Sequence, residues 1–281
     1  MSATSSRLPV VFLHGWPVTQ DHWRHLSPRL VDAGFAPTAI SLPGLGVPAT
    51  GVSSFRKAHL AARLREELNG LGVTRFALVG HDWGATVALL LAAAAPDSVV
   101  GLVVEEEIAP GVDVEIPEPG TAHYPSWHGP FNRVPGLADT LVPGREDAYY
   151  GTFLKESAGP AGLDESVQRS YIDAYRAEEV LEAGLGYYRT RADDVTDVNR
   201  LRSDPVAVPV LAVGGRYAMG SAVVEGLRPL ATNVSGVVLD RSGHYPVEQE
   251  PEQAGRAVVA FLEHLRSVEA GPFRRASDGP V

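Results

Sequence analysis

Short apolar segments alternate with longer mixed segments along the first 110 residues of the chain. Four apolar segments have the length of buried β-strands: residues 9–13, 37–42, 75–81 and 99–104. The segments between them have the length of helices, over residues 20–33, 53–71 and 83–95, with Ser53 as an N-cap and Pro96 as a stop. Strands that alternate with helices in this way predict a mainly parallel sheet with helices on both faces.

The pattern changes after about residue 110. Prolines crowd residues 111–135, and no strand pattern occurs before Pro209. Three segments look helical: residues 149–154, 165–175 and 180–191. We therefore predict that residues 111–203 form a mostly helical cap, inserted after the fourth strand. The insertion leaves the sheet at the carboxyl ends of its strands, where open α/β folds bind ligands, so we expect the cap to cover the site.

The strand pattern returns in the last part of the chain. Two further strands are predicted, over residues 209–215 and 236–239, and the helices that follow them over residues 221–230 and 251–268. The tail after Gly271 is predicted to be disordered. These segments complete an α/β core that consists of residues 1–110 and 204–281.

Asp82 stands where the third predicted strand turns abruptly into a helix. So sharp a turn forces strained backbone angles, and Gly80 and Gly84 provide the small neighbours that it needs. A serine at this place would attack a saturated carbon to form a stable ether. A carboxylate forms an ester instead, whose carbonyl carbon water can then attack. The motif therefore predicts covalent opening of an epoxide or of a carbon–halogen bond.

Composition narrows the class of protein. The 281 residues are 44% hydrophobic, enough for one large α/β domain with an insertion. The net charge of -10 argues against a nucleic-acid surface, and the absence of cysteine excludes disulfides and thiolate chemistry. No stretch is long enough for a signal peptide or a membrane span, and no His, Asp or Glu cluster has the spacing of metal ligands. We expect a cytoplasmic enzyme without cofactor, metal or membrane partner.

Six motifs together resemble the α/β-hydrolase superfamily, and within it the epoxide hydrolases, over nearly the whole chain. They are His14-Gly-Trp-Pro17, Pro43-Gly-Leu-Gly46, Gly80-His-Asp-Trp-Gly84, Glu105-Glu-Glu-Ile-Ala-Pro110, Gly186-Tyr-Tyr-Arg189 and Ser242-Gly-His-Tyr245. The resemblance implies the α/β-hydrolase fold and a small-molecule epoxide as substrate. It further implies that the epoxide is hydrolysed to a vicinal diol through a covalent aspartyl ester.

The resemblance also implies roles for the matched residues. Asp82 would be the nucleophile, and His244, in a loop after the last strand, would be the base that activates water. The backbone N–H groups of Trp16 and Trp83 would form an oxyanion hole, with a cis peptide before Pro17. His14 is expected to be a packed structural histidine.

The acid that orients His244 is expected at the end of the fourth strand. Many members of the resembled family carry this acid after the strand that corresponds to residues 209–215. The residues that follow this strand here, Arg216-Tyr-Ala-Met219, include no carboxylate. Glu105, Glu106 and Glu107 are the candidates, and the spacing to Pro110 favours Glu106. Adjacent residues point in opposite directions, so all three cannot face His244, and at least one is expected at a solvated edge.

Opening of an epoxide also needs an acid for the departing oxygen. By resemblance, cap residues Tyr188 and His128 would donate the proton, and His128 replaces the tyrosine that most relatives have. Competing tyrosines are Tyr124, Tyr171 and Tyr187. Trp127 and Tyr187 are expected to contact the substrate.

Two other functions use the same residues. A dehalogenase would attack a carbon–halogen bond with Asp82, although the resembled dehalogenases carry Asn in place of Trp16 or Arg in place of Trp83. A ligand-binding relative without activity is the alternative from another class. Residues 37–42 are predicted to form an edge strand because no hairpin precedes residue 9, and such an edge suits a homodimer.

Overall fold

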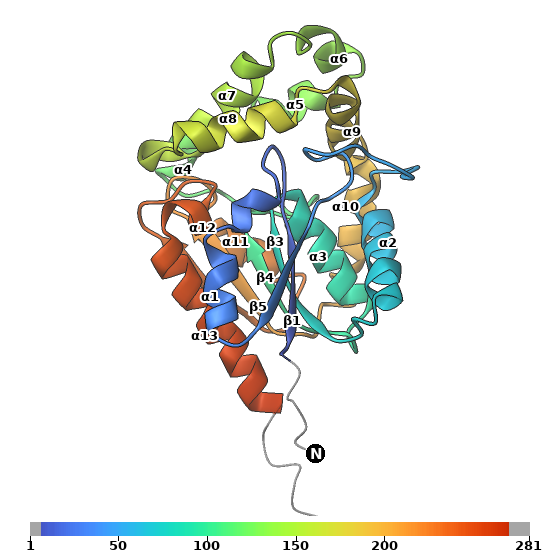
Figure 1. Ribbon diagram of the computed structural model, residues 1–281, viewed down its shortest axis with the longest axis vertical. Helices are drawn as coiled ribbons and strands as arrows, with labels where there is room; N and C mark the ends of the chain where they lie inside the picture. The colour runs from blue at the N-terminus through green and yellow to red at the C-terminus, as the bar shows by residue number, and fades with distance from the viewer. Residues whose placement is uncertain (1–6, 270–281) are drawn as a thin grey trace, which may run out of the picture.

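Six parallel strands form one sheet at the centre of the computed structural model, which describes residues 7–269 (Figure 1). The sheet order is β2-β1-β3-β4-β5-β6. The strands are β1 (Pro9–Leu13), β2 (Ala36–Ile40), β3 (Phe76–His81), β4 (Val99–Glu105), β5 (Val210–Gly215) and β6 (Val234–Leu239). All six predicted strands are confirmed, with shifts of one or two residues at their ends. The predicted disordered tail lies outside the described residues.

Helices cover both faces of the sheet because its central strands are apolar on both sides. Val11 and Leu13 of β1 pack with α2 (Lys57–Gly70) and α3 (Trp83–Ala94). Val10 and Phe12 of the same strand pack on the opposite face with α1 (Leu26–Asp32) and α13 (Pro251–Glu269). Figure 1 shows these two helices on the other side of the sheet from α2 and α3. Side chains that alternate along a strand thus divide the core into two layers. The remaining elements of the core are η1 (Gln20–Trp23), α11 (Ala222–Leu227) and α12 (Pro246–Gln249).

The insertion between β4 and β5 is helical and lies over the carboxyl ends of the strands (Figure 1). Its elements are α4 (Gly120–His123), α5 (His128–Arg133), α6 (Leu137–Leu141), α7 (Glu146–Ser157), η2 (Gly159–Ala161), α8 (Glu165–Ala174), α9 (Glu178–Arg189) and α10 (Arg191–Arg200). Helix α10 was not predicted as a separate element. Its sequence is rich in Asp, Thr and Asn, which are weak helix formers, and contacts with α2 support it instead.

Two features of the described residues bear on partners. Strand β2 is at the edge of the sheet, as expected, and the homodimer inferred from that edge stays a prediction. Within residues 7–269, every helix is too short or too polar to cross a bilayer.

The start of α2 corrects one prediction and explains how the insertion is attached. Ser53 does not cap the helix, which begins at Lys57 with Arg56 at the N-cap position and no side-chain cap there. The backbone N–H of Lys57 is instead bonded by Asp194 Oδ1 of α10, at 2.8 Å. A tertiary contact thus satisfies a helix end that local sequence leaves open.

Lys57 also ties the insertion to the core through its side chain. The ammonium is fully buried, with Nζ 2.9 Å from Asp194 Oδ2, and it donates to the carbonyl of Tyr187 and to Thr190 Oγ1. Burial lowers the pKa of Lys57, and the charge of Asp194 opposes that shift. Nζ also lies 4.0 Å from the centre of the Trp83 ring, a cation–π distance.

Replacement of Lys57 by Met is expected to lower the free energy of unfolding by about 3–5 kcal/mol, because it leaves the buried Asp194 carboxylate unpaired. The double variant Lys57→Met/Asp194→Leu removes both charges and should recover most of that loss. Lys155, the chain's other lysine, is exposed, and the variant Lys155→Met serves as the control. Urea unfolding measures all three, and an equal loss in the single and double variants would contradict the account.

Candidate active site

Asp82 lies between β3 and α3 with φ 50° and ψ -130°, a conformation that non-glycine residues rarely adopt. Neighbouring glycines make this turn sterically accessible. A Cβ atom at Gly80 would lie 2.5 Å from the Cα of Ala85, and one at Gly84 would lie 2.2 Å from the carbonyl oxygen of Leu13. The strained turn predicted at residue 82 is present.

The loop after β1 holds the Asp82 carboxyl group in place. The Trp16 N–H donates to Asp82 Oδ1 at 2.9 Å, and the Trp16–Pro17 peptide is cis. Gly15 packs so closely that an added Cβ would lie 2.3 Å from that of Asp82. Among the described residues, no hydrogen bond joins the Trp83 N–H, the other predicted donor, to this carboxyl group.

His244 lies between Asp82 and Glu106, and all three are buried. Its Nδ1 is 3.1 Å from Glu106 Oε2, and its Nε2 is 3.7 Å from Asp82 Oδ2, which is within ion-pair range but too long for a hydrogen bond. Glu106 has φ 50° and also accepts bonds from the backbone N–H groups of Gly215 at 2.6 Å and Met219 at 3.2 Å. Asp82 and Glu106 are the only non-glycine residues with positive φ between residues 7 and 269.

The electrostatics of this group favour a charged imidazole. Burial by itself lowers the pKa of His244, but the nearby Asp82 carboxyl group and the hydrogen-bonded Glu106 outweigh it and raise the pKa to about 9. Burial raises the pKa of Glu106, and its bonds with His244, Gly215 and Met219 oppose that rise. The position of His244 between two carboxyl groups thus favours the imidazolium form of its ring.

The three successive glutamates at the end of β4 face three different places. Glu105 bonds His22 at 3.0 Å, Glu106 bonds His244, and Glu107 accepts a bond from Thr86 Oγ1 at 2.5 Å. All three are buried, so the expectation that at least one lies at a solvated edge is wrong. The insertion covers the strand ends where they lie, and each carboxyl group has a polar partner there.

A buried ionic network, which sequence reasoning missed, lies behind the site. Both ring nitrogens of His22 face carboxylates, Nδ1 with Glu248 at 2.8 Å and Nε2 with Glu105 at 3.0 Å. Arg24 and the Tyr171 hydroxyl also contact Glu248, at 2.7 and 2.6 Å. Burial lowers the pKa of His22, but the two glutamates raise it to about 9. His22 is thus a structural cation. Its two acidic partners are distant in sequence, so this role can be recognised only in the folded chain.

Two more buried histidines support this arrangement without charge. The His81 ring lies between those of His22 and His244, with centroids 4.3 and 4.7 Å away, and His81 Nε2 donates to the His244 carbonyl at 2.8 Å. His14 Nδ1 contacts the Gly15 carbonyl at 3.0 Å, and burial lowers its pKa to about 4. These are the contacts of structural histidines.

A cavity of about 420 Å³ opens beside Asp82 under the insertion. Core and insertion both line it. The residues that matter for chemistry are Asp82, Trp83, Glu107, Tyr124, His128 and Tyr188. The predicted nucleophile therefore shares one cavity with both predicted proton donors. In the part of the chain that the structure describes, no group of three His, Asp or Glu side chains has the arrangement of a metal site.

Tyr188 and His128 differ in what they can do there. The Tyr188 ring packs edge-on against Trp83 and Trp16, and burial raises its pKa well above the usual range. His128 Nδ1 is 2.8 Å from the carbonyl of Pro125, so this nitrogen carries the proton. Burial also lowers the pKa of His128 to about 4. A neutral ring bonded in this way offers an unprotonated Nε2, so the geometry does not support His128 as a proton donor.

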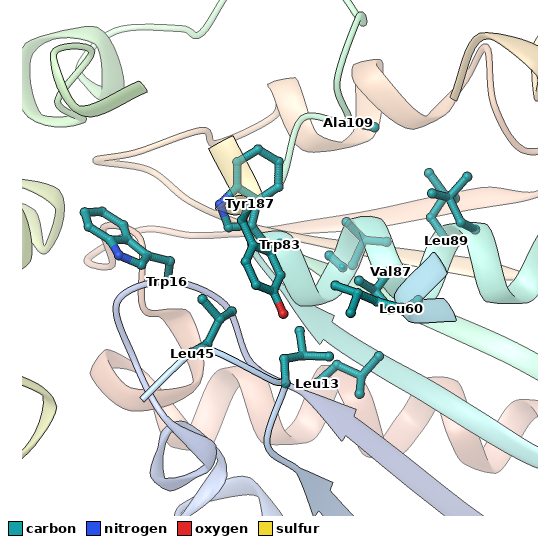
Figure 2. Close-up of a cluster of buried hydrophobic side chains, with 14 of the residues drawn as sticks. Leu13, Trp16, Leu45, Leu60, Trp83, Val87, Leu89, Ala109 and Tyr187 are labelled. Carbon is teal, nitrogen blue, oxygen red and sulfur yellow. The ribbon is translucent and has the colours of Figure 1, made fainter. Parts of the chain in front are cut away.

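Trp127 and Tyr187, the expected substrate contacts, do not line the cavity. Tyr187 lies in the buried cluster of Figure 2 near Trp83, and its hydroxyl donates to the Pro43 carbonyl at 2.8 Å. Trp127 Nε1 donates to Glu156 at 3.1 Å. Tyr187 and Tyr188 are consecutive residues of α9 and point about 100° apart, so Tyr187 faces elsewhere although its neighbour lines the cavity.

Comparison with known proteins places the chain among hydrolases. A model of the alpha/beta hydrolase family matches residues 10–260. The chain is 28% identical to the soluble epoxide hydrolase of Corynebacterium sp. strain C12, over 93% of this chain and 92% of that protein. It is 27% identical to the fluoroacetate dehalogenase of a Burkholderia species, over 92% and 88%. The structure of the epoxide hydrolase CorEH without ligand matches with a TM-score of 0.80, 28% identity and 93% of each chain covered.

The His22 network makes a prediction about pH. Its folded-state pKa of about 9 lies above the ordinary 6.5, so its stabilisation is complete below pH 6.5 and is lost as pH rises through 9. The wild-type free energy of unfolding should fall relative to that of His22→Gln between pH 7 and 9, by up to about 1.4 kcal/mol per pH unit. Urea unfolding at a series of pH values measures this difference. Parallel curves for the two proteins would contradict it.

Proposed function

The chain belongs to the alpha/beta hydrolase family, and we propose that this hydrolase opens an epoxide to a vicinal diol through an ester on Asp82. One observation carries the proposal: the Asp82 carboxyl group faces a cavity, with the Trp16 N–H on one oxygen and His244 Nε2 3.7 Å from the other. The soluble epoxide hydrolase of Corynebacterium and the CorEH structure, each aligned over 93% of this chain, support it. In this proposal residues 111–203 act as a cap on a core of residues 1–110 and 204–281.

The first step forms the ester. An Asp82 carboxylate oxygen attacks a ring carbon, the carbon–oxygen bond breaks, and the electron pair moves to the epoxide oxygen. That oxygen leaves on the side opposite to Asp82, towards the cap. Tyr188 donates its proton to it, because an alkoxide is a stronger base than even a buried phenolate. The His244 imidazolium then restores the Tyr188 proton through water in the cavity.

The second step hydrolyses the ester. Ester formation removes the charge of Asp82, one of the two that raise the pKa of His244, so the ring becomes a neutral base, and Glu106 keeps its Nδ1–H oriented. His244 takes a proton from water as the hydroxyl attacks the Asp82 acyl carbon. The other water proton completes the diol when the carbon–oxygen ester bond breaks.

The Trp16 N–H is placed to stabilise the negative oxygen of the tetrahedral intermediate, since it already bonds Asp82 Oδ1. Trp83 is the proposed second donor. Such donors are worth roughly 2.7–4 kcal/mol each where they have been removed from other enzymes.

A dehalogenase is the second candidate, and one observation favours it. Trp83 lines the cavity, and its buried indole Nε1 has no hydrogen-bond partner among the described residues, so it is available to a halide. A fluoroacetate dehalogenase is also among the relatives. Diol formation and halide release, measured side by side on matched substrates, distinguish the two activities. A ligand-binding relative without activity would form neither product.

Incubation of His244→Gln with an epoxide should leave a stable ester on the protein, because the first step proceeds without a base and the second does not. Intact-protein mass spectrometry should find the mass of one epoxide added, and peptide mapping should place it on Asp82. The control Asp82→Asn/His244→Gln should stay unmodified. In heavy-oxygen water, a single wild-type turnover should label Asp82, and turnover without that label would contradict the mechanism.

Tyr188→Phe should slow ester formation by roughly 10²–10⁴-fold, because the departing oxygen loses its proton donor. Tyr187→Phe is the matched control, since its hydroxyl bonds Pro43 outside the cavity and its rate should change little. Rapid quenching of a single turnover measures ester formation directly. If both variants form the ester at the same rate, Tyr188 is not the proton donor. Tyr124, which also lines the cavity, is then the next candidate.

A further inference from the structure

Glu107 is the one glutamate of the three that lines the cavity, and the proposed reaction does not use it. Its side chain is 7% exposed and lines the same cavity as Asp82. Thr86, in the first turn of α3, donates to its Oε1 at 2.5 Å. Among the described residues, Oε2 has no hydrogen-bond partner. A buried carboxyl group is therefore held by one oxygen, with the other free for a molecule in the cavity.

The surroundings of Glu107 favour its neutral form. Burial and the charge of Asp82 raise the pKa of Glu107 to about 8, while Thr86, His244 and Lys57 oppose that rise. The uncharged hydroxyl of Tyr124 is also near. Because the Thr86 hydroxyl donates to Oε1, a proton taken up by this carboxyl group would be on Oε2.

Glu107 lies on the wrong side to protonate the epoxide oxygen. It follows β4, and Asp82 follows the neighbouring strand β3, so both belong to the floor of the cavity. An oxygen displaced by Asp82 departs from that floor, towards Tyr188 of the cap. Glu107 lines the cavity at that floor, so it is placed to contact a polar substituent of an epoxide that lies against the floor.

We propose that Glu107 is a specificity-determining residue, whose Oε2–H donates a hydrogen bond to an ether or carbonyl oxygen that the substrate carries next to its epoxide ring. The inference rests on the proposed function and names its substrate class: oxygen-substituted epoxides such as glycidyl ethers. The nearby lining residues Ile108, Pro110, Ile116 and Met219 are apolar. A methylene group in place of the oxygen would therefore leave the acid without a partner, which is how polar sites reject apolar analogues.

The test compares glycidyl methyl ether with 1,2-epoxypentane, which differ only by an oxygen in place of a methylene group. The readout is the ratio of the two kcat/KM values, with kcat and KM determined separately. The wild type should favour the ether, and Glu107→Leu should reduce that preference about tenfold, mainly through KM for the ether. Glu107→Gln should retain it, because its amide N–H₂ still donates while Thr86 binds its oxygen.

Two further measurements separate recognition from structure. The wild-type preference should decline as pH rises through about 8, where Oε2 loses its proton, whereas that of Glu107→Gln should stay constant. Glu225→Gln, at an exposed glutamate paired with Arg228, is the matched control and should behave as the wild type. Intrinsic reactivity of the two epoxides is common to all variants and cancels in the comparison.

The outcomes distinguish this inference from the proposed function. If both epoxides are hydrolysed with the same ratio in the wild type and Glu107→Leu, Glu107 does not select the substrate, while the proposed function stands. If Glu107→Leu does not fold, the other measurements decide. The inference is overturned, and the proposed function stands, if Glu107→Gln loses the preference for the ether or if the wild-type ratio does not change with pH. If the wild type opens neither epoxide and His244→Gln gains no mass from either, the proposed function falls, and the inference with it.

Discussion

The strained backbone at Asp82 is the constraint on which the rest of the structure depends. A residue with φ 50° can be held there only if β1, β3 and the first turn of α3 approach one another closely, and glycines at positions 15, 80 and 84 allow that approach. The same approach brings the Trp16 N–H to 2.9 Å from the Asp82 carboxyl group. Strain at the turn and the hydrogen bond to the carboxyl group therefore have one structural cause.

Charge in the core is organised around that turn. Glu105, Glu106 and Glu107 follow one another in sequence, yet each belongs to a different system: the His22 network, the His244 pair and the cavity. The positive φ of Glu106 breaks the simple alternation of a strand and contributes to this separation. Three adjacent carboxyl groups can be buried together because their partners differ: a histidinium, backbone N–H groups and a hydroxyl.

The insertion is attached to the core at the same place where it contributes to the site. Asp194 of α10 bonds both the backbone and the ammonium group of Lys57, and the ammonium group lies over the Trp83 ring, which borders the cavity. The carbonyl of Tyr187 accepts from Lys57, and the next residue, Tyr188, faces the cavity. The carbonyl bond of Lys57 thus connects the position of Tyr188 to a buried ion pair.

Local patterns in the sequence were enough to determine the parallel sheet, the helical insertion after the fourth strand and the turn at Asp82, because apolar periodicity and glycine placement act over a few residues. Contacts that form only in the folded chain decided the rest. Asp194 rather than Ser53 completes the start of α2, and His22 joins Glu105 and Glu248 in a buried network that no motif indicates. The Pro125 carbonyl sets which His128 nitrogen is protonated, and helix orientation turns Tyr187 away from the cavity while Tyr188 faces it. Each depends on which partner a side chain meets once the chain is folded, and such a partner can be as far away in sequence as Asp194 is from Lys57, outside any one motif.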